Sequence, residues 1–169
     1  MPLGSQPKKE LTSASFFVII MATTHAPRRT DKTGKYYEYF IEYLLSRKGY
    51  NVDSQENIGL RPTGGHHYTD LIVEDWDTGE KEIISLKIQM GRGTAEEKVP
   101  YEAMCLQDAC DRYGYTHAII VLAGDGWMHD EAYINGAFSK WMNTPDVEVI
   151  SHDTFMERYD LNGVILKNV

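Results

Sequence analysis

The sequence predicts an α/β fold in which a mixed central sheet of about four or five strands is flanked by helices on both faces. Two observations carry this prediction. After an initial hairpin, segments with the apolar spacing of helices alternate with segments of strand type. Residues 116–123 then form a continuous apolar run, as expected for a strand buried on both faces. With 169 residues, of which 42% are hydrophobic, the chain is long enough to bury a core as one domain.

The first twenty residues read as a tag or leader, and residues 21–169 as a single domain. MPLGS resembles a cloning remnant, and Met21 begins a natural start. The apolar run 16–21 is far too short to span a bilayer, so we expect no membrane anchor. Cys105 and Cys110 fall in one predicted helix without the Cys/His spacing of a zinc site, which suits a reducing cytoplasm.

The first helix is predicted from Thr30 to Gly49. Its apolar residues follow the spacing of a buried stripe, and they are Tyr37, Phe40, Ile41, Leu44 and Leu45. Glu38 and Glu42 share a face beside this stripe. Such a pair either solubilises the helix or approaches a metal ion, because clustered carboxylates suit a hard cation.

The region around this helix is basic in a chain of net charge −8. Its cations are Arg28, Arg29, Lys32, Lys35, Arg47 and Lys48. From Tyr101 onward, in contrast, eleven Asp or Glu residues stand against four Lys or Arg. The basic region would attract a phosphate backbone, or it is an ordinary solvated helix face. The overall negative charge argues against strong non-specific DNA affinity.

Residues 50–60 read as one strand, and they lead to a glycine-containing loop at residues 61–65 that allows close backbone approach to a ligand. His66 and His67 follow this loop. Neighbouring strand residues face opposite ways, so the two imidazoles cannot both enter one site unless the loop is irregular. Either histidine touches DNA or assists a metal site, or both are polar loop residues.

A predicted hairpin comes next, with a turn at residues 75–81. Its first strand surrounds Asp70, and its second strand spans residues 82–89. Strict alternation puts Ile83, Ser85, Lys87 and Gln89 on one face, and Ile84, Leu86 and Ile88 on the other. The hairpin can set Asp70 beside Lys87. This pair suits metal-dependent phosphodiester hydrolysis, or it is a cross-strand ion pair.

The second long helix follows a loop that carries Arg92. Thr94 and Glu97 form a possible capping box, although the regular helix could instead begin at Pro100. The helix N-terminus, beside Arg92 and Lys98, would suit a phosphate. The stripe Ala103, Leu106, Ala109, Cys110 and Tyr113 leads to a stop at Gly114. A helix at about 129–142, a strand at 147–150 and a helix from about Ser151 complete the prediction.

The order helix, strand ending in Thr69 and Asp70, strand with SLKIQ at residues 85–89, and helix resembles the core of the PD-(D/E)XK nuclease superfamily. The run GTAEEKVPYE at residues 93–102 is also similar to a sub-group of phage and restriction-type nucleases. The match covers about residues 34–127. This resemblance implies a restriction-endonuclease-like core, Mg²⁺ or Mn²⁺, and duplex DNA as the substrate. It implies that Asp70 binds the metal and that Lys87 orients water.

Two residues depart from the family pattern. Thr69 replaces the name-giving proline, and Ser85 replaces the second carboxylate. Serine cannot supply the missing negative charge. Three alternatives remain open: the acid has moved elsewhere, Asp70 holds the metal with backbone carbonyls and waters, or catalysis is weakened. Glu38 and Glu42 are the best substitutes for the acid, with Glu82 or a second subunit next.

The leading hypothesis is a divalent-metal-dependent DNA endonuclease of restriction, homing or repair type, acting as a dimer or higher homo-oligomer in the cytoplasm of a prokaryotic or phage-infected cell. Its expected catalytic residues are Asp70, Lys87, Gln89 and Ser85. Its expected DNA contacts are Arg28, Arg29, Lys35, Arg61, His66, His67, Arg92 and Lys98. The alternative hypothesis is a non-catalytic nucleic-acid-binding or assembly module that retains a nuclease core.

Overall fold

The computed structural model describes residues 31–137 and 139–166. The expectations for residues 1–20, Arg28 and Arg29 therefore lie outside the described residues. The helices are α2 (Asp31–Lys48), α3 (Ala95–Tyr113), α4 (Asp130–Ile134), α5 (His152–Arg158) and α6 (Asn162–Leu166). The strands are β1 (Asn51–Ser54), β2 (Asn57–Leu60), β3 (His66–Tyr68), β4 (Leu71–Glu74), β5 (Lys81–Ile88), β6 (His117–Ala123) and β7 (Val147–Ser151).

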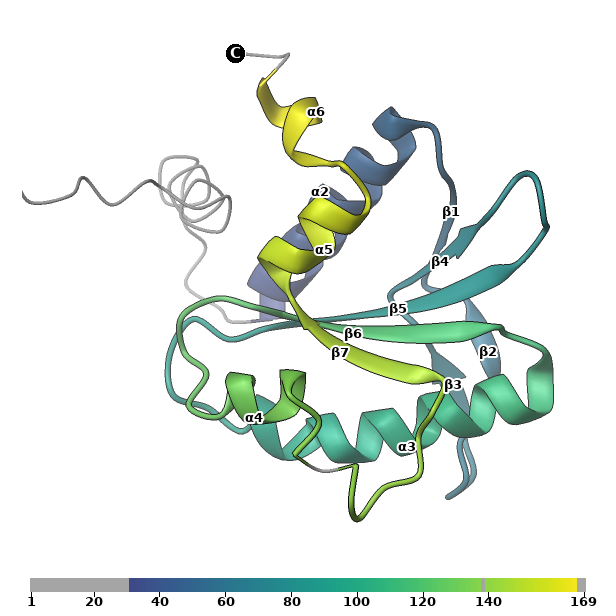
Figure 1. Ribbon diagram of the computed structural model, residues 1–169, viewed down its shortest axis with the longest axis vertical. Helices are drawn as coiled ribbons and strands as arrows, with labels where there is room; N and C mark the ends of the chain where they lie inside the picture. Colours follow the sequence, from purple (N-terminus) through teal and green to yellow (C-terminus); the bar gives the residue numbers. More distant parts are fainter. Residues whose placement is uncertain (1–30, 138, 167–169) are drawn as a thin grey trace, which may run out of the picture.

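The central sheet has five strands in the order β1-β4-β5-β6-β7. Strands β1, β4 and β5 pair antiparallel, whereas β5, β6 and β7 pair parallel. Helices α2 and α5 lie on one face of this sheet, and α3 and α4 lie on the other (Figure 1). The predicted α/β class with a mixed sheet is thus confirmed. No helix among the described residues is long and apolar enough to cross a bilayer.

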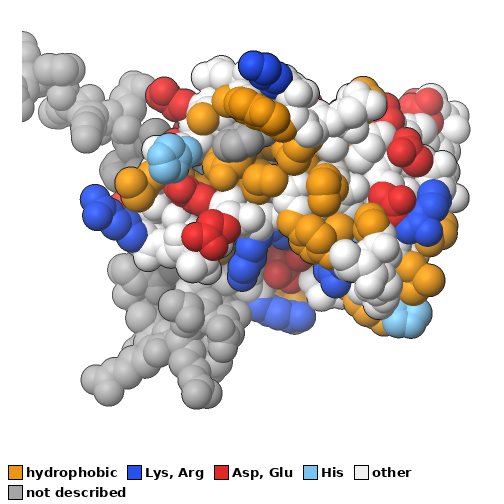
Figure 2. All heavy atoms as spheres, turned by 90° about the horizontal axis from the view of Figure 1, so that it is seen from below, with side chains coloured by type: hydrophobic (Ala, Val, Ile, Leu, Met, Phe, Trp, Pro, Cys, Tyr) orange, Lys and Arg blue, Asp and Glu red, His pale blue; other side chains and the backbone are white. Residues whose placement is uncertain are grey.

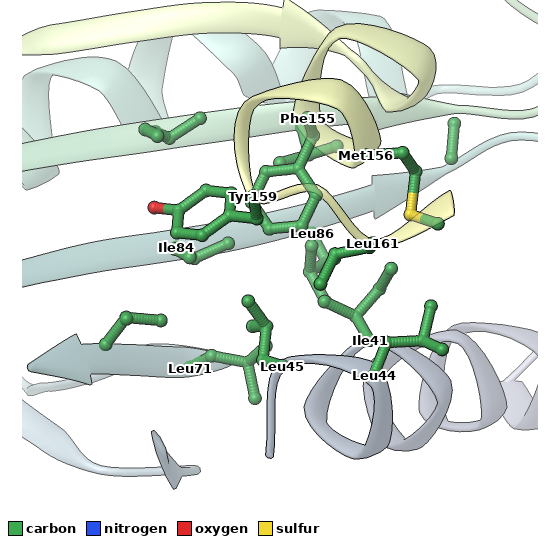
Figure 3. Close-up of a cluster of buried hydrophobic side chains, with 14 of the residues drawn as sticks. Ile41, Leu44, Leu45, Leu71, Ile84, Leu86, Phe155, Met156, Tyr159 and Leu161 are labelled. Carbon is green, nitrogen blue, oxygen red and sulfur yellow. The ribbon is translucent and has the colours of Figure 1, made fainter. Parts of the chain in front are cut away.

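Alternating side chains on β5 contribute to two separate hydrophobic clusters. Ile84 and Leu86 pack with residues of α2 and α5 on one face (Figure 3). Ile83 belongs to the cluster on the opposite face, where Val99 and Leu106 of α3 are buried. The predicted alternation of this strand is confirmed, and Ser85 and Lys87 consequently face α3. Strand β6 is buried over six of its seven residues, as predicted for a central strand.

The predicted strand at residues 50–60 is wrong, because the chain turns at Gln55, which has a left-handed φ of 56°. Strand β1 joins the central sheet, whereas β2 pairs with β3 in a separate two-stranded sheet. The strand predicted around Asp70 is divided in the same way. The Gln55 N–H donates to the Asp70 carbonyl at 3.0 Å. The segment that follows β1 and the segment that precedes β4 therefore leave the central sheet at the same point.

The small β2–β3 sheet packs against the C-terminal part of α3. A Cβ atom at Gly59, whose φ is 119°, would overlap the ring of Tyr113. The Tyr113 hydroxyl accepts the Leu60 N–H at 3.2 Å, and Arg112 donates to the Leu60 carbonyl at 2.7 Å. Tyr113 therefore supports this sheet, although it remains 41% exposed and is not a fully buried member of the predicted stripe.

Helix α3 begins at Ala95 and continues through Pro100, so the alternative start at Pro100 is wrong. The predicted capping box is also wrong, because the Thr94 side chain makes no capping hydrogen bond. The Gln89 side-chain oxygen instead accepts the Ala95 N–H at 3.2 Å. Pro100 has no N–H to offer the Glu96 carbonyl four residues earlier. The Tyr133 hydroxyl of α4 donates to that carbonyl at 2.9 Å.

Helix α4 is much shorter than the predicted helix at residues 129–142. It has five residues, and turns follow it. Gly136 lies just beyond its end with a left-handed φ of 68°, a conformation that stops a helix. The other C-terminal predictions are confirmed, since β7 and α5 occupy the expected ranges and the Ser151 hydroxyl accepts the Thr154 N–H at the start of α5.

Figure 2 shows the side of the molecule that carries α3 and α4, where hydrophobic side chains gather between charged ones. A pocket between α3, α4 and β7 is lined mainly by apolar residues, including Val99, Ile134 and Val149. Glu148 is the acid among its lining residues, and Arg158 donates to both Glu148 oxygens at 2.7 and 2.9 Å. This pocket therefore lacks an open group of carboxylates.

The contact between Tyr133 and the Glu96 carbonyl predicts a specific coupling with Pro100. Tyr133→Phe should destabilise the protein by about 1 kcal/mol or more, because the carbonyl loses its partner. In a Pro100→Ala background the N–H of residue 100 can donate to the Glu96 carbonyl in place of the Tyr133 hydroxyl. Tyr133→Phe should therefore destabilise this variant clearly less. Urea unfolding of the four proteins in this double-mutant cycle measures the difference. Equal costs in both backgrounds would contradict the proposed compensation.

Candidate active site

Asp70 lies in the break between β3 and β4, next to the middle of β5. The antiparallel register pairs Leu71 with Ile84, which places Asp70 beside Ser85. The Leu86 N–H donates to Oδ2 of Asp70 at 2.6 Å. Thr69 is buried, and its hydroxyl donates to the Ile84 carbonyl at 3.2 Å. Thr69 thus joins β4 to β5 at the point where the carboxylate leaves the backbone.

Ser85 and Lys87 share a third partner that the sequence analysis did not identify. This partner is Glu102, in the second turn of α3. The Ser85 hydroxyl donates to Oε1 of Glu102 at 2.7 Å, and Nζ of Lys87 donates to the same oxygen at 3.2 Å. An acid from the helix therefore occupies the neighbourhood of the position where the family pattern expects an acid on the strand.

The position of Glu102 follows from the buried stripe of α3. Val99 lies three residues before Glu102 and Leu106 lies four residues after it, and both are buried. Residues at these spacings share one side of a helix. Glu102 therefore points toward the sheet. This spacing is visible in the sequence, since Glu102 and Leu106 both lie within the predicted helix whether it begins near Thr94 or at Pro100. The sequence does not show which strand residues this side of the helix meets.

The Glu102 side chain is only 15% exposed. Burial alone would raise its pKa, but His67, Lys87 and Ser85 together hold that pKa well below its usual range. Nε2 of His67 lies 3.9 Å from Oε2 of Glu102, which is too far for a hydrogen bond. Lys87 and Ser85 are therefore the direct partners that keep Glu102 ionised.

Asp70 has the opposite shift. Burial raises its pKa, and the negative charge of Glu102 adds to this effect. Lys87, the Leu86 N–H and His67 act in the other direction without cancelling it. On acidification, Asp70 is thus protonated and loses its charge at a higher pH than an ordinary aspartate. A neighbouring cation would favour its charged form.

Glu38 and Glu42 differ in how closely they approach this cluster. Glu38 is partly buried and accepts a hydrogen bond from Nε2 of Gln55 at 2.8 Å. Burial raises its pKa and the charge of Asp70 raises it further, whereas Lys35 and Lys87 lower it. Glu38 is therefore within electrostatic reach of Asp70. Glu42 instead accepts a hydrogen bond from the Ser54 hydroxyl at 3.2 Å.

Gln89 connects the loops beyond β5 through hydrogen bonds of its side chain. It is buried, and its Nε2 donates to the Gly126 carbonyl at 2.8 Å while its Oε1 accepts the Ala95 N–H. A Cβ atom at Gly126 would overlap the Gly91 backbone, so these loops pass very close together. Both ends of the Gln89 amide are thus engaged in holding the start of α3.

The predicted DNA contacts lie at several places. His67 is 1% exposed and lies near Glu102, whereas His66 is exposed and contacts Asn57 at 2.9 Å, so the neighbours face opposite ways as predicted. Arg61 donates to the His66 carbonyl at 3.3 Å. Lys35 is exposed on α2. Arg92 and Lys98 are exposed before and within the start of α3.

Comparison with known proteins gives one family match. The model of a PD-(D/E)XK nuclease superfamily domain matches residues 29–158. No curated protein sequence matches the chain. This match range contains every residue of the cluster formed by Glu38, Asp70, Ser85, Lys87 and Glu102.

Two solved structures are similar to the chain at low identity. The first is a protein of unknown function, AF1548, with 14% identity and a TM-score of 0.41 over 68% of this chain and 56% of that chain. The chain thus spans little more than half of that protein. The second is the small subunit (R.BspD6I2) of the heterodimeric restriction endonuclease R.BspD6I, with 16% identity and a TM-score of 0.48 over 86% of this chain and 74% of that chain.

The electrostatic coupling within the cluster can be measured directly. Glu102→Gln should lower the pKa of Asp70, because it removes a nearby negative charge and releases Lys87 to act on Asp70 alone. Carboxyl-carbon NMR titration of the two proteins measures this change. Glu42→Gln is the matched control and should leave the Asp70 titration in place. An unchanged or raised pKa of Asp70 in Glu102→Gln would show that the two carboxylates do not share one site.

Proposed function

The chain belongs to the PD-(D/E)XK nuclease superfamily, and we propose that it is a divalent-metal-dependent DNA endonuclease whose second metal-binding carboxylate is Glu102. One observation carries this proposal. The hydroxyl of Ser85, which stands where the family pattern has an acid, donates to Oε1 of Glu102 at 2.7 Å. This contact supports the proposal that α3 supplies the acid which β5 lacks, because Glu102 also binds Lys87 and acts electrostatically on Asp70.

The donor atoms of the cluster fit a hard cation. Asp70 uses Oδ2 for the Leu86 N–H, and Glu102 uses Oε1 for Ser85 and Lys87, so Oδ1 and Oε2 lie outside these hydrogen bonds. Within the described ranges no three His, Cys, Asp or Glu side chains form a ready metal cage. Mg²⁺ fits such a site, because it keeps several waters and uses one or two carboxylates plus substrate phosphate oxygens.

Each residue of the cluster has a distinct role in this proposal. Asp70 and Glu102 hold Mg²⁺ or Mn²⁺, which when bound lowers the pKa of water and neutralises phosphate charge. Lys87, held by Glu102, orients the attacking water or stabilises the charge that develops on the phosphate. Ser85 positions Glu102. Glu38 adds negative charge from α2, and Gln89 positions the start of α3 rather than contacting substrate.

Duplex DNA is the proposed substrate. Lys35, Arg61, Arg92 and Lys98 are the described cations that we assign to its phosphates, together with His66 and with Arg28 and Arg29 outside the described residues. His67 is assigned instead to the site, behind Glu102. Since one chain has one such site, cutting both strands requires two copies or two successive events, and we propose a symmetric dimer or higher assembly acting in the cytoplasm.

A non-catalytic nucleic-acid-binding or assembly module is the second candidate. Ser85 favours it, because the strand itself lacks the acid. The clustering of Asp70, Lys87 and Glu102 favours the nuclease. Cleavage of plasmid DNA that requires Mg²⁺ or Mn²⁺ and stops when the metal is chelated separates the two functions. Binding without cleavage in either metal would favour the second candidate.

Exchange of the acid between helix and strand tests the assignment of Glu102. Glu102→Gln should reduce Mg²⁺-dependent cleavage by roughly tenfold or more, as expected when a metal-supporting residue is lost. The double variant Glu102→Ser with Ser85→Glu returns the acid to the strand and should recover part of this loss. Initial cleavage rates on plasmid DNA measure both effects, with Asp70→Asn as the inactive reference.

Glu42→Gln is the matched control for this experiment, because Glu42 binds Ser54 away from the cluster. The cleavage rate of Glu42→Gln should stay within about twofold of that of the unmodified protein, a change too small to reflect a lost metal ligand. Full activity in Glu102→Gln would remove Glu102 from the site. If Glu42→Gln instead lost as much activity as Glu102→Gln, the acid would come from α2.

A further inference from the structure

The outer face of α2 carries three exposed tyrosines. Tyr36, Tyr39 and Tyr43 are 45%, 55% and 53% exposed. At 100° per residue these positions fall within one narrow part of the helix surface. They lie opposite the stripe of Tyr37, Ile41 and Leu44 that packs on the sheet. Each tyrosine is about half exposed and belongs to neither buried hydrophobic cluster. A group of exposed aromatic side chains of this kind commonly marks an interaction surface.

The same face is positively charged. Lys35 and Arg47 are exposed within an arc of about 120° that also holds the three tyrosines. Nζ of Lys35 lies 5.6 Å from the centroid of the Tyr39 ring. Among the described side chains of α2, the acids are Glu38 and Glu42. Both lie beyond the Lys35 edge of this arc, where Glu38 contacts Gln55 within electrostatic reach of Asp70 and Glu42 contacts Ser54.

This arrangement of rings and cations has the chemistry of a surface for unpaired bases. Aromatic rings stack on bases of any sequence, and Lys or Arg beside them contact the phosphates. In a duplex the base faces are already stacked on one another, and only base edges are accessible in the grooves. A helix rise of 1.5 Å per residue separates Tyr36 from Tyr43 by about 10 Å along the axis, a length suited to two or three bases.

We propose that the Tyr36, Tyr39 and Tyr43 face of α2 binds a short single-stranded segment of the DNA substrate next to the cleavage site. The proposal deepens the proposed function and rests on it for the identity of the ligand. Glu38 lies within electrostatic reach of both Lys35 and Asp70, so the Lys35 end of this face is the end nearer to the candidate active site. The preferred substrate is then a duplex with an adjoining unpaired region, such as a tail or a fork.

A second copy of this chain fits the face less well. In a two-fold symmetric pair of antiparallel helices, Lys35 of one copy would lie near Arg47 of the other. Within this arc of about 120° none of the described side chains of α2 is acidic, and Glu38, which lies within electrostatic reach of Lys35, contacts Gln55 outside the arc. The like charges of Lys35 and Arg47 would therefore repel in such a pair. The negative charge of a nucleic-acid strand complements both residues. Charge therefore favours DNA over self-association at this surface.

The test measures binding without cleavage, by fluorescence anisotropy in EDTA. Two labelled DNAs are compared: a blunt duplex and the same duplex with a single-stranded tail. The unmodified protein should bind the tailed DNA more tightly. The Tyr39→Ala, Tyr43→Ala double variant should lose roughly tenfold or more in affinity for the tailed DNA and keep its affinity for the blunt duplex. No charge is altered, so phosphate attraction stays constant.

Two control variants isolate stacking. The Tyr39→Phe, Tyr43→Phe double variant keeps both rings and should retain the preference for tailed DNA. Trp141→Ala removes a more exposed ring, 73% exposed, outside α2 and should have no effect. All variants should keep the thermal midpoint of the unmodified protein, because the altered rings do not pack in the core.

Three results would overturn this inference. The unmodified protein could bind both DNAs equally, or the alanine variant could keep the full preference for the tail. The alanine variant could also fall from dimer to monomer in light scattering, which would make this face an interface between copies. Failure of the proposed nuclease function gives a different result, because a preference for tailed DNA in EDTA would persist while no metal supported cleavage.

Discussion

The packing of α3 on one face of β5 is the constraint on which the candidate site depends. Strand geometry sends Ser85 and Lys87 to the same face as buried Ile83. The buried residues Val99 and Leu106 fix the rotation of α3 against that face. Glu102 lies between them in sequence and must therefore meet Ser85 and Lys87. The hydrophobic contact thus positions a carboxylate, although the carboxylate itself does not favour burial.

The resulting cluster has more negative than positive charge. The negative charges of Asp70, Glu102 and Glu38 outnumber the positive charge of Lys87. Burial weakens the screening of all four groups by water. Burial is the main cause of the raised pKa values of Asp70 and Glu38, and the neighbouring carboxylates add to it. A divalent cation would neutralise the excess negative charge of the cluster, whereas a neutral ligand would not. The same charge distribution that costs folding free energy thus prepares the cluster to bind a metal ion.

Periodicity in the sequence was sufficient to predict α2, the hairpin of β4 and β5, the alternation of β5 and the buried strand β6. The hairpin also predicted that Asp70 lies beside Lys87, whereas the register places Asp70 beside Ser85 and Lys87 pairs with Glu102. Glu102 was not predicted in the same way, although both predicted helix starts place it inside the helix, because its meeting with Ser85 and Lys87 depends on how α3 packs on β5. The predicted start at Pro100 was wrong for a different reason. The hydroxyl of Tyr133, from a distant part of the chain, replaces the hydrogen bond that Pro100 removes. The break at Gln55 was missed because its left-handed backbone has no glycine to signal it.

The position of a bound metal ion shows whether Glu102 of α3 replaces the acid that is missing from β5. Crystals soaked in Mn²⁺ and measured near the manganese absorption edge locate the ion by anomalous scattering. We predict a peak within coordination distance of carboxylate oxygens of both Asp70 and Glu102. A peak that contacts Asp70 and an acid of α2, with Glu102 still bound only to Ser85 and Lys87, would contradict this prediction.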